Sequence, residues 1–170
     1  MHTAYFGNIA WYRQMVLNGG IGCLDRHERW QKQTERNRCH IVTANGTQCL
    51  TVPVTVPQSH CTTDEVLISD HGNWQHLHWN ALCSAYGTSP FFEFYADDIR
   101  PFFEGRWEKL FDFNLEITTK ILHLIGITDA LVEEPQQQYY QTFQRRHGFI
   151  GGMSILDLLF NEGPEAVKYI

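Results

Sequence analysis

The sequence predicts a mixed α/β fold in which most strands come before most helices. Three observations lead to this class: about five strand-like segments lie within the first 69 residues, helical periodicity runs from residue 73 to residue 125, and a short apolar helix pattern follows near the end. We expect one α/β domain over residues 1–134 and a C-terminal tail over residues 135–170. A chain of 170 residues can form a sizeable core, since domains of this size bury roughly 70% of their unfolded surface.

The N-terminal region predicts a β-α-β unit. Residues 3–6 have the pattern of a short strand, and Gly7-Asn8 leads into a helix over residues 9–17 that Asn18-Gly19-Gly20 ends. Residues 21–24 predict the second strand of the unit. A helix that follows a strand exposes free N–H groups at its amino end, and such ends favour anions.

A β-hairpin is predicted next. Residues 38–43 and 47–55 flank Asn45-Gly46, a dipeptide that favours the tight turn between two paired strands. Pro53 places the second segment at a sheet edge, because proline has no N–H to donate. Residues 65–69 predict a further strand.

Three helices rich in aromatic residues follow. They are predicted over residues 73–86 with Gly87 as the stop, from Ser89-Pro90 to residue 99, and over residues 107–125 before Gly126.

One more strand is predicted at residues 131–133, at the end of the domain, and the tail contains a short helix that begins after Ser154 as N-cap and ends at Gly163. This helix is strongly apolar, so it would promote aggregation if it were exposed. We therefore expect it to pack on the domain or on a partner subunit, and a homo-oligomer formed through it is our expectation.

Composition excludes several classes of partner. The net charge is −6 and basic residues are scattered outside residues 26–38, which argues against a nucleic-acid-binding face. No run of about 18 apolar residues exists, so we expect no membrane insertion. The five cysteines have no C-x-x-C spacing and follow no secretory signal, so we expect reduced thiols in a cytoplasmic protein.

Two arginines form the main candidate binding feature. Arg36 and Arg38 are two residues apart, so in an extended segment their side chains point the same way and can clamp one carboxylate or phosphate. A small anionic substrate is therefore the expected partner. The alternative is a solvated charge cluster with no ligand.

The helical half supplies the other candidates. His78 lies on the same predicted helix face as Trp74, whereas His76 is about 200° away, so the two histidines cannot share one metal ion. His78 is either a core histidine or a general base. Asp97 and Asp98 end a helix, where negative charge is disfavoured, so they need a partner arginine, a bound cation or an acid–base role.

Asn114 lies on the apolar stripe of the long helix. A buried amide needs hydrogen-bond partners, so Asn114 is either a structural bracket or a ligand contact.

These residues together resemble the WbqC-like family along nearly the whole chain. The resemblance rests on Thr3 to Phe6 with the following helix, Gln33 to Cys39, Val52-Pro53-Val54, His78-Trp79, Ala85-Tyr86-Gly87, Ser89 to Glu93, Asp97-Asp98, Leu110 to Asn114 and Ser154 to Gly163. Family members usually carry prolines just after the first tyrosine, where this chain has Gly7-Asn8.

The resemblance implies an acyl or aminoacyl (glycine-type) transferase that acts on an amino sugar or a nucleotide-linked sugar in bacterial surface-polysaccharide biosynthesis. For such a transfer our hypothesis is that His78 and Asp97 are catalytic, with His78 deprotonating the amine and Asp97 orienting His78 or the substrate, while Arg36 and Arg38 bind the anionic donor or nucleotide-linked sugar. The implied substrate-binding residues are Tyr5, Gln33, Arg36, Asn37, Arg38, Asp98 and Asn114. No cofactor and no metal ligand is assigned.

Two alternatives come from other classes of protein. No G-x-S-x-G, Walker loop or H-E-x-x-H motif occurs, so a non-catalytic module that binds a carboxylate or phosphate within a biosynthetic complex fits the same residues. In a third interpretation, Asp97 and Asp98 hold a divalent metal for nucleotide-sugar chemistry.

Overall fold

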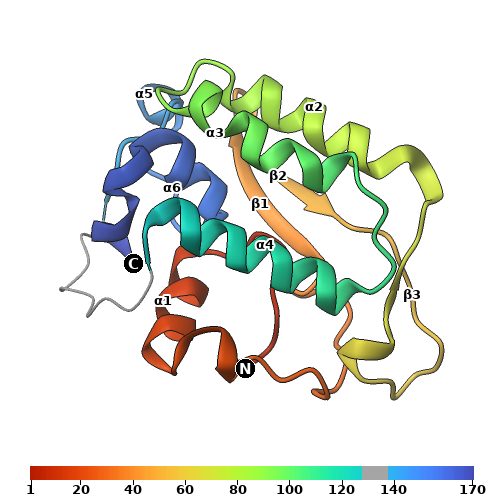
Figure 1. Cartoon of the computed structure of the whole chain (residues 1–170). Coiled ribbons are helices and arrows are strands. Elements are labelled where there is room, and N and C mark those ends of the chain that lie inside the picture. The colour runs from red at the N-terminus through yellow and green to blue at the C-terminus, as the bar shows by residue number, and fades with distance from the viewer. Residues whose placement is uncertain (128–137) are drawn as a thin grey trace.

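The computed structural model describes residues 1–127 and 138–170, and it has a mixed α/β fold, as predicted from the sequence (Figure 1). The helices in the described residues are α1 (Ile9–Leu17), α2 (Trp74–Tyr86), α3 (Phe92–Ile99), α4 (Leu110–Ile125), α5 (Gln144–His147) and α6 (Ile155–Glu162). The strands form two small sheets, β1 (Arg38–Thr43) with β2 (Gly46–Thr51), and β3 (Val54–Thr55) with β4 (Leu67–Ile68).

The predicted hairpin is present as the antiparallel pair β1–β2. Its register places Arg38 opposite Thr51 and Thr43 opposite Gly46. Gly46 has a φ of 106°, a left-handed conformation that glycine adopts without steric cost, so it can close the turn that Asn45 enters. The second predicted strand ends early, because Pro53 interrupts it between β2 and β3.

The predicted N-terminal β-α-β unit is wrong in its two strands. Within the part of the chain that the structure describes, residues 3–6 pair with no strand, and the Tyr5 N–H donates to the Glu35 carbonyl at 2.9 Å. Phe6 has a φ of 42°, which ends the extended run before a ladder can form. Gly19 and Gly20 also have positive φ, and the chain continues there as the 3₁₀ turn Gly20–Cys23.

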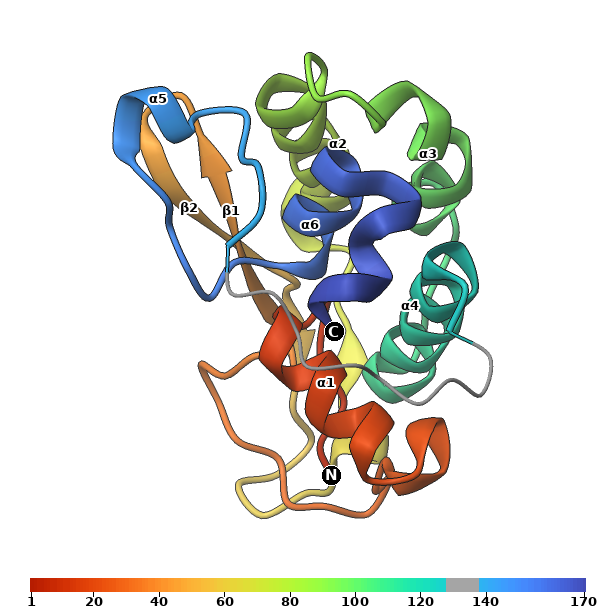
Figure 2. The ribbon, with the colours of Figure 1, turned by 90° about the vertical axis from the view of Figure 1, so that its left-hand side faces the viewer.

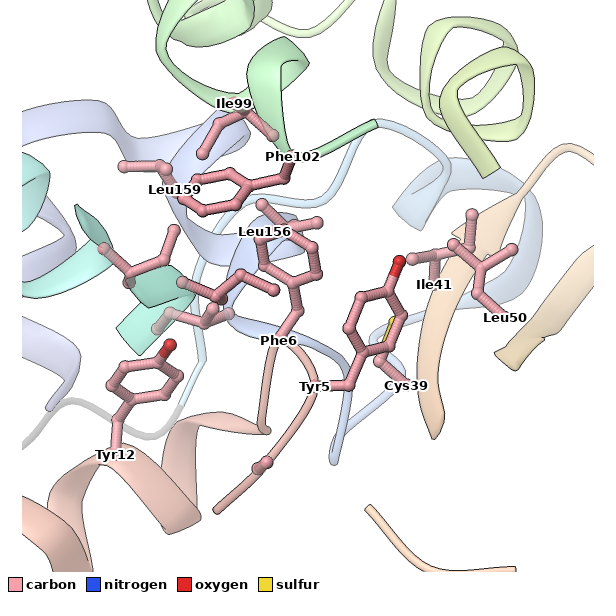
Figure 3. Packing of buried hydrophobic residues seen from close by; sticks show 14 of the residues in the cluster. Tyr5, Phe6, Tyr12, Cys39, Ile41, Leu50, Ile99, Phe102, Leu156 and Leu159 are labelled. Carbon is pink, nitrogen blue, oxygen red and sulfur yellow. The ribbon is translucent and has the colours of Figure 1, made fainter. Parts of the chain in front are cut away.

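The core lies between the helices and the inner face of the hairpin. Figure 2 shows α6 between the hairpin and α4, with α1 below it. In Figure 3, Phe6 points toward Leu156 of α6 and toward Phe102, whose ring centroid is 6.2 Å away. Because the residues from Ile155 to Asn161 are buried, the apolar tail helix is covered within this chain. The predicted aggregation hazard is thereby removed.

Local capping signals fix the ends of the helices. Asn8 caps α1 by accepting a bond from the Trp11 N–H at 2.8 Å, and Ser154 caps α6 through the Leu156 N–H at 3.2 Å. The helix predicted from Ser89-Pro90 begins instead at Phe92. The strand predicted at residues 131–133 and the predicted domain boundary at residue 134 lie outside the described residues.

Candidate functional site

A small polar cleft opens where three segments meet. The segments are the turn before α1, the chain entering β1 and the turn before α6. The cleft has space for about one water molecule, about 10 Å³, so only the end group of a ligand fits inside it as it stands. Its lining residues are Phe6, Asn8, Glu35, Arg38, Cys39, His40, Gly152 and Ser154.

The amino ends of α1 and α6 adjoin each other at this cleft. The two N-cap residues, Asn8 and Ser154, pair in an isolated antiparallel bridge. The Ile155 N–H donates to the Gly7 carbonyl at 2.9 Å, and the Ser154 hydroxyl donates to the Phe6 carbonyl at 2.8 Å. The positive ends of two helix dipoles therefore adjoin the cleft, and each such end attracts negative charge.

Arg38 brings a formal positive charge to the same cleft. It is half-buried at the start of β1, and its Nε is buried with no hydrogen-bond acceptor among the described residues. A buried N–H group without an acceptor lowers the stability of the folded state, so the Arg38 Nε–H can still donate a hydrogen bond to a bound ligand.

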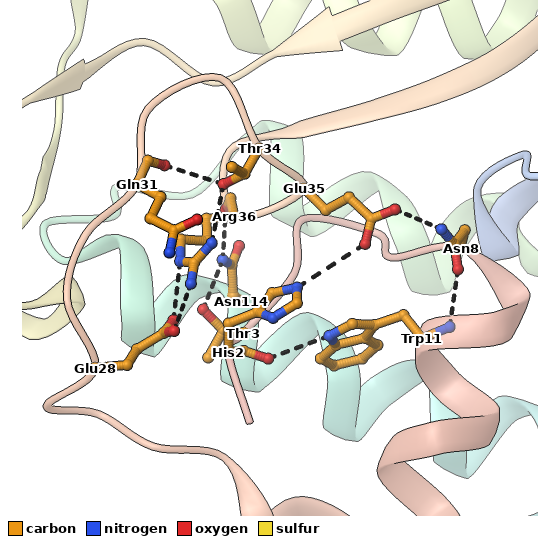
Figure 4. Close-up of polar contacts among 10 residues, drawn as sticks. All are labelled: His2, Thr3, Asn8, Trp11, Glu28, Gln31, Thr34, Glu35, Arg36 and Asn114. Carbon is orange, nitrogen blue, oxygen red and sulfur yellow. Dashed lines mark hydrogen bonds and ion pairs between the residues drawn. The ribbon is translucent and has the colours of Figure 1, made fainter.

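Glu35 adds a negative charge to the cleft wall. Its carboxylate accepts a bond from the Asn8 amide, and Nε2 of His2 lies 3.9 Å from its other oxygen (Figure 4). Within the described residues, no ion pair joins Glu35 to Arg38. The cleft therefore carries charges of both signs that do not neutralise each other by direct contact.

Arg36 does not share this cleft. It is 5% exposed and forms a two-pronged ion pair with Glu28, in which its Nε lies 3.0 Å from one carboxylate oxygen (Figure 4). It also donates to the Thr34 hydroxyl at 3.2 Å. Because Arg36 lies in a turn, the extended geometry that the predicted two-arginine clamp required is absent. Its charge is already matched inside the protein.

Asn37 and Asn114 hold this turn in place. The Asn37 amide donates to the Val52 carbonyl at 2.9 Å, and the Asn114 amide donates to the Arg36 carbonyl at 2.7 Å and to Thr3 at 3.1 Å. These bonds attach the turn to the hairpin and to α4. For Asn114, this is the structural role that the sequence offered as one of two alternatives. The amide oxygen of each residue is buried and has no partner within the described chain.

His78 and Tyr5 form a buried pair behind the cleft. The Tyr5 hydroxyl lies 2.9 Å from Nδ1 of His78, and the Trp74 ring packs on the imidazole with centroids 5.2 Å apart. Burial lowers the pKa of His78 to about 4, although the nearby Thr51 carbonyl opposes this shift. The imidazole is therefore neutral near pH 7, and because its other nitrogen donates to the Thr51 carbonyl, Nδ1 accepts a hydrogen bond from the Tyr5 hydroxyl.

Cys39 separates this pair from the cleft. It lines the cleft and also lies near Tyr5 in the core, as Figure 3 shows. Burial raises the pKa of the Cys39 thiol and that of the Tyr5 hydroxyl well above their ordinary values. Both groups are therefore neutral at physiological pH.

The remaining predicted site residues lie elsewhere. Asp98 pairs with Lys120 of α4 at 3.2 Å, so a cation partner offsets its position at the end of α3. Asp97 is exposed and has no hydrogen bond to His78 in the described part of the structure. Gln33 is exposed with a φ of 60°. The described residues contain no group of three or more His, Cys, Asp or Glu side chains placed to hold a metal ion.

Among the residues that line the cleft, Arg38 alone was a predicted site residue, and sequence reasoning missed the polar residues Asn8, Glu35, His40 and Ser154. Asn8 and Ser154 carried a usable signal, since each is a residue type that caps helices and each precedes a predicted helix. Nothing in the sequence indicated that the two caps would meet. Glu35 stood among charged neighbours and gave no separate signal.

The structure thus combines helices packed on a short hairpin with a polar cleft where the amino ends of α1 and α6 adjoin. The model of the WbqC-like protein family matches residues 5–142, so the chain belongs to that family. It is similar to the uncharacterized protein Rv1507c of Mycobacterium tuberculosis (strain ATCC 25618 / H37Rv), with 30% identity over 98% of this chain and 91% of the relative. No solved structure matches the chain. Among the described residues, no helix combines the length and apolarity needed to cross a membrane.

Proposed function

We propose that this protein binds the carboxylate of a small molecule at the Arg38 cleft. The observation that carries the proposal is the buried Arg38 Nε, which has no acceptor among the described residues although it lies at a polar cleft. A ligand carboxylate would supply the missing acceptor, and guanidinium–carboxylate bonds are among the strong hydrogen bonds in proteins.

The helix ends support an anion in the same position. The N-caps of α1 and α6 are joined by the Asn8–Ser154 bridge, so two positive dipole ends adjoin the guanidinium. Arg36 cannot contribute a second charge, because Glu28 already neutralises it. A single guanidinium suits a singly charged carboxylate better than a phosphate dianion.

Glu35 sharpens this choice of ligand. A second negative charge on the ligand would meet the Glu35 carboxylate in the cleft wall, whereas an ammonium group would be attracted to it. The two charges of opposite sign therefore favour a zwitterion, in which one end is a carboxylate and the other an amine. Because the cleft has room for only about one water molecule, one carboxylate oxygen of the ligand enters it, and the ammonium group and the rest of the ligand stay at its rim.

Aminoacyl transfer to an amino sugar is a second candidate function, which the family resemblance implies. The observation that favours it is that His78 is neutral near pH 7, which is the protonation state a general base requires. Because the imidazole is already bonded to Tyr5 and lies behind Cys39, this role requires both side chains to move aside when the amine binds. In this reaction the amine of the sugar forms an amide bond to the aminoacyl carbonyl. The bond to the leaving group breaks, and the proton of the amine passes to the base.

Binding is tested by isothermal titration calorimetry with glycine, acetate and inorganic phosphate. We expect glycine to bind more tightly than acetate, and acetate more tightly than phosphate, with all binding lost in Arg38→Gln. Arg13→Gln is the matched control, because Arg13 is exposed on α1 and the charge change is identical. Unchanged binding by Arg38→Gln would refute the proposal.

Transfer is tested separately with a glycyl thioester as donor and glucosamine as acceptor, with mass spectrometry of the N-glycyl product. His78→Asn should abolish product while it preserves glycine binding. A thioester turned over equally by the wild type and by His78→Asn would remove the catalytic role of the histidine, and the binding proposal would stand.

A further inference from the structure

The hairpin and α2 share a sequence property that the cleft does not use. Residues 39–63 and residues 71–92 contain no Asp, Glu, Lys or Arg, although these residues make up 19% of the chain. The first stretch includes β2 and the second includes α2. Depletion of charge is the compositional mark of the centre of a protein interface.

A groove lies between these two charge-free elements. It has a volume of about 370 Å³ and includes Gln48 of the hairpin and Leu77 of α2. Leu77 is 59% exposed, which makes it one of the few large apolar side chains that the described structure leaves open to solvent. The hairpin lies at the margin of the molecule opposite α3 and α4 (Figure 2).

The outer edge of β2 has unused backbone groups. The His40 carbonyl and the Val42 N–H both bond outside the hairpin, to Ser154 and to Tyr86. Along an antiparallel strand, the backbone N–H and C=O groups of successive residues point alternately to one side and to the other. Because residues 40 and 42 bond away from β2, the backbone groups of residues 39, 41 and 43 point toward β2.

The register then assigns residues 46, 48 and 50 to the inner side of β2, and it directs Thr47 and Cys49 outward. Both residues are exposed, and within the described residues no backbone hydrogen bond joins either of them to a backbone group outside the hairpin.

The edge carries none of the usual protection against strand pairing. Gly46–Thr51 contains no proline and no charged side chain. In a chain with a net charge of −6, two copies repel each other least where neither carries a charge. A second copy of the same chain is therefore the occupant that this surface fits best.

The geometry points to a two-fold symmetric dimer in which β2 of one protomer pairs antiparallel with β2 of its partner. In the register that satisfies all free groups, Thr47 lies opposite Cys49 of the partner subunit and Gln48 lies at the two-fold axis. The two hairpins then form one four-stranded sheet. Both α2 helices lie on the same face of this sheet, where Leu77 becomes covered at the groove.

Sedimentation equilibrium across a concentration series tests the interface. The wild type should dimerise, and Leu77→Glu should weaken the dimer at least about tenfold, because it places like charges near the two-fold axis. Phe94→Glu is the matched control, since Phe94 is 72% exposed on α3, away from the hairpin, and this variant should dimerise as the wild type does. A wild type that stays monomeric, or a Leu77→Glu variant that dimerises equally well, overturns the proposal.

The register has its own readout, which does not depend on the folding of Leu77→Glu. In a Cys49→Ser background, Gln48→Cys should form an intermolecular disulfide under mild oxidation, because residues at the axis in a non-hydrogen-bonded pair have Cα atoms about 4.5 Å apart. Thr51→Cys in the same background should not cross-link. Cross-linking of Thr51→Cys without cross-linking of Gln48→Cys overturns the proposed pairing.

Discussion

The buried Arg36 and the partly buried Glu28 form an ion pair that joins the turn before β1 to the chain segment that precedes it. Arg36 was half of the predicted anion clamp, and its pairing turns it into a structural residue. Glu28 also accepts a bond from the Thr63 hydroxyl at 3.2 Å, so the pair reaches the short 3₁₀ turn Thr63–Glu65.

Removing the charge of Glu28 should destabilise the protein. Glu28→Gln leaves a buried guanidinium without its counter-charge, which costs about 3–5 kcal/mol in buried pairs. Urea unfolding measures this loss. Glu104→Gln is the control, because the Arg100–Glu104 pair is exposed and its loss should cost no more than about 1 kcal/mol. Equal losses in the two variants would mean that the buried pair has no special structural role.

The stability contributed by His78 should depend on pH. The folded protein gives His78 a pKa of about 4, below the ordinary value of 6.5. Between pH 4 and pH 6.5, His78 therefore binds a proton in the unfolded chain but not in the folded protein. Stability is therefore fully present above pH 6.5 and decreases as the pH falls toward 4, by roughly 3 kcal/mol in total.

The measurement is the unfolding free energy of the wild type and of His78→Gln at several pH values. The difference between the two proteins should shrink as the pH falls, and His71→Gln, at an exposed position, should not change this trend. A histidine NMR signal for His78 that titrates near 6.5 would contradict the assignment.

Asp157 should show the opposite dependence. Its carboxylate accepts bonds from Tyr86 at 2.9 Å, Tyr139 at 2.6 Å and Gln141 at 2.7 Å, yet burial outweighs these bonds and raises its pKa. The folded state therefore binds the proton more tightly than the unfolded state does.

Relative to Asp157→Asn, the wild type should gain stability as the pH falls through the raised pKa toward the ordinary range of aspartate. Chemical unfolding of both proteins between neutral and acidic pH checks this trend. A wild type that loses stability relative to the asparagine variant on acidification would show that the hydrogen bonds dominate over burial.

Gly163 should tolerate no side chain. It ends α6 with a φ of 56°, and a Cβ atom there would lie 2.7 Å from the Phe91 ring. Gly163→Ala therefore combines backbone strain with a clash in the core, and we expect a loss of more than about 2 kcal/mol. Gly19→Ala is the comparison, since Gly19 has a φ of 99° with no atom within 4 Å of a built Cβ. A similar melting temperature for the two variants would show that Phe91 moves aside easily.

Elements with local signals were predictable from the sequence. The helix between Asn8 and Asn18 and the helix between Ser154 and Gly163 have the expected ends, because a capping side chain and a terminating residue act within one turn. The hairpin was predictable for the same reason, since its turn is encoded by adjacent residues.

Features that depend on distant partners were not predictable. Residues 3–6 have the composition of a strand, but a strand also requires a neighbour, and that neighbour is absent among the described residues. Arg36 looked available because Glu28 is brought to it only by the fold. The cleft is likewise built from three segments, and the meeting of Asn8 with Ser154 has no sequence signature.

The central claim, that Arg38 receives a ligand carboxylate, is tested most directly by observing the Arg38 Nε–H group itself. Glycine should shift its ¹⁵N and ¹H NMR signals in a saturable manner and slow the exchange of its proton with water, while the Arg36 Nε–H signal, held by Glu28, stays in place. An Arg38 signal that is indifferent to glycine and to acetate, in a protein whose other resonances are intact, would contradict the account.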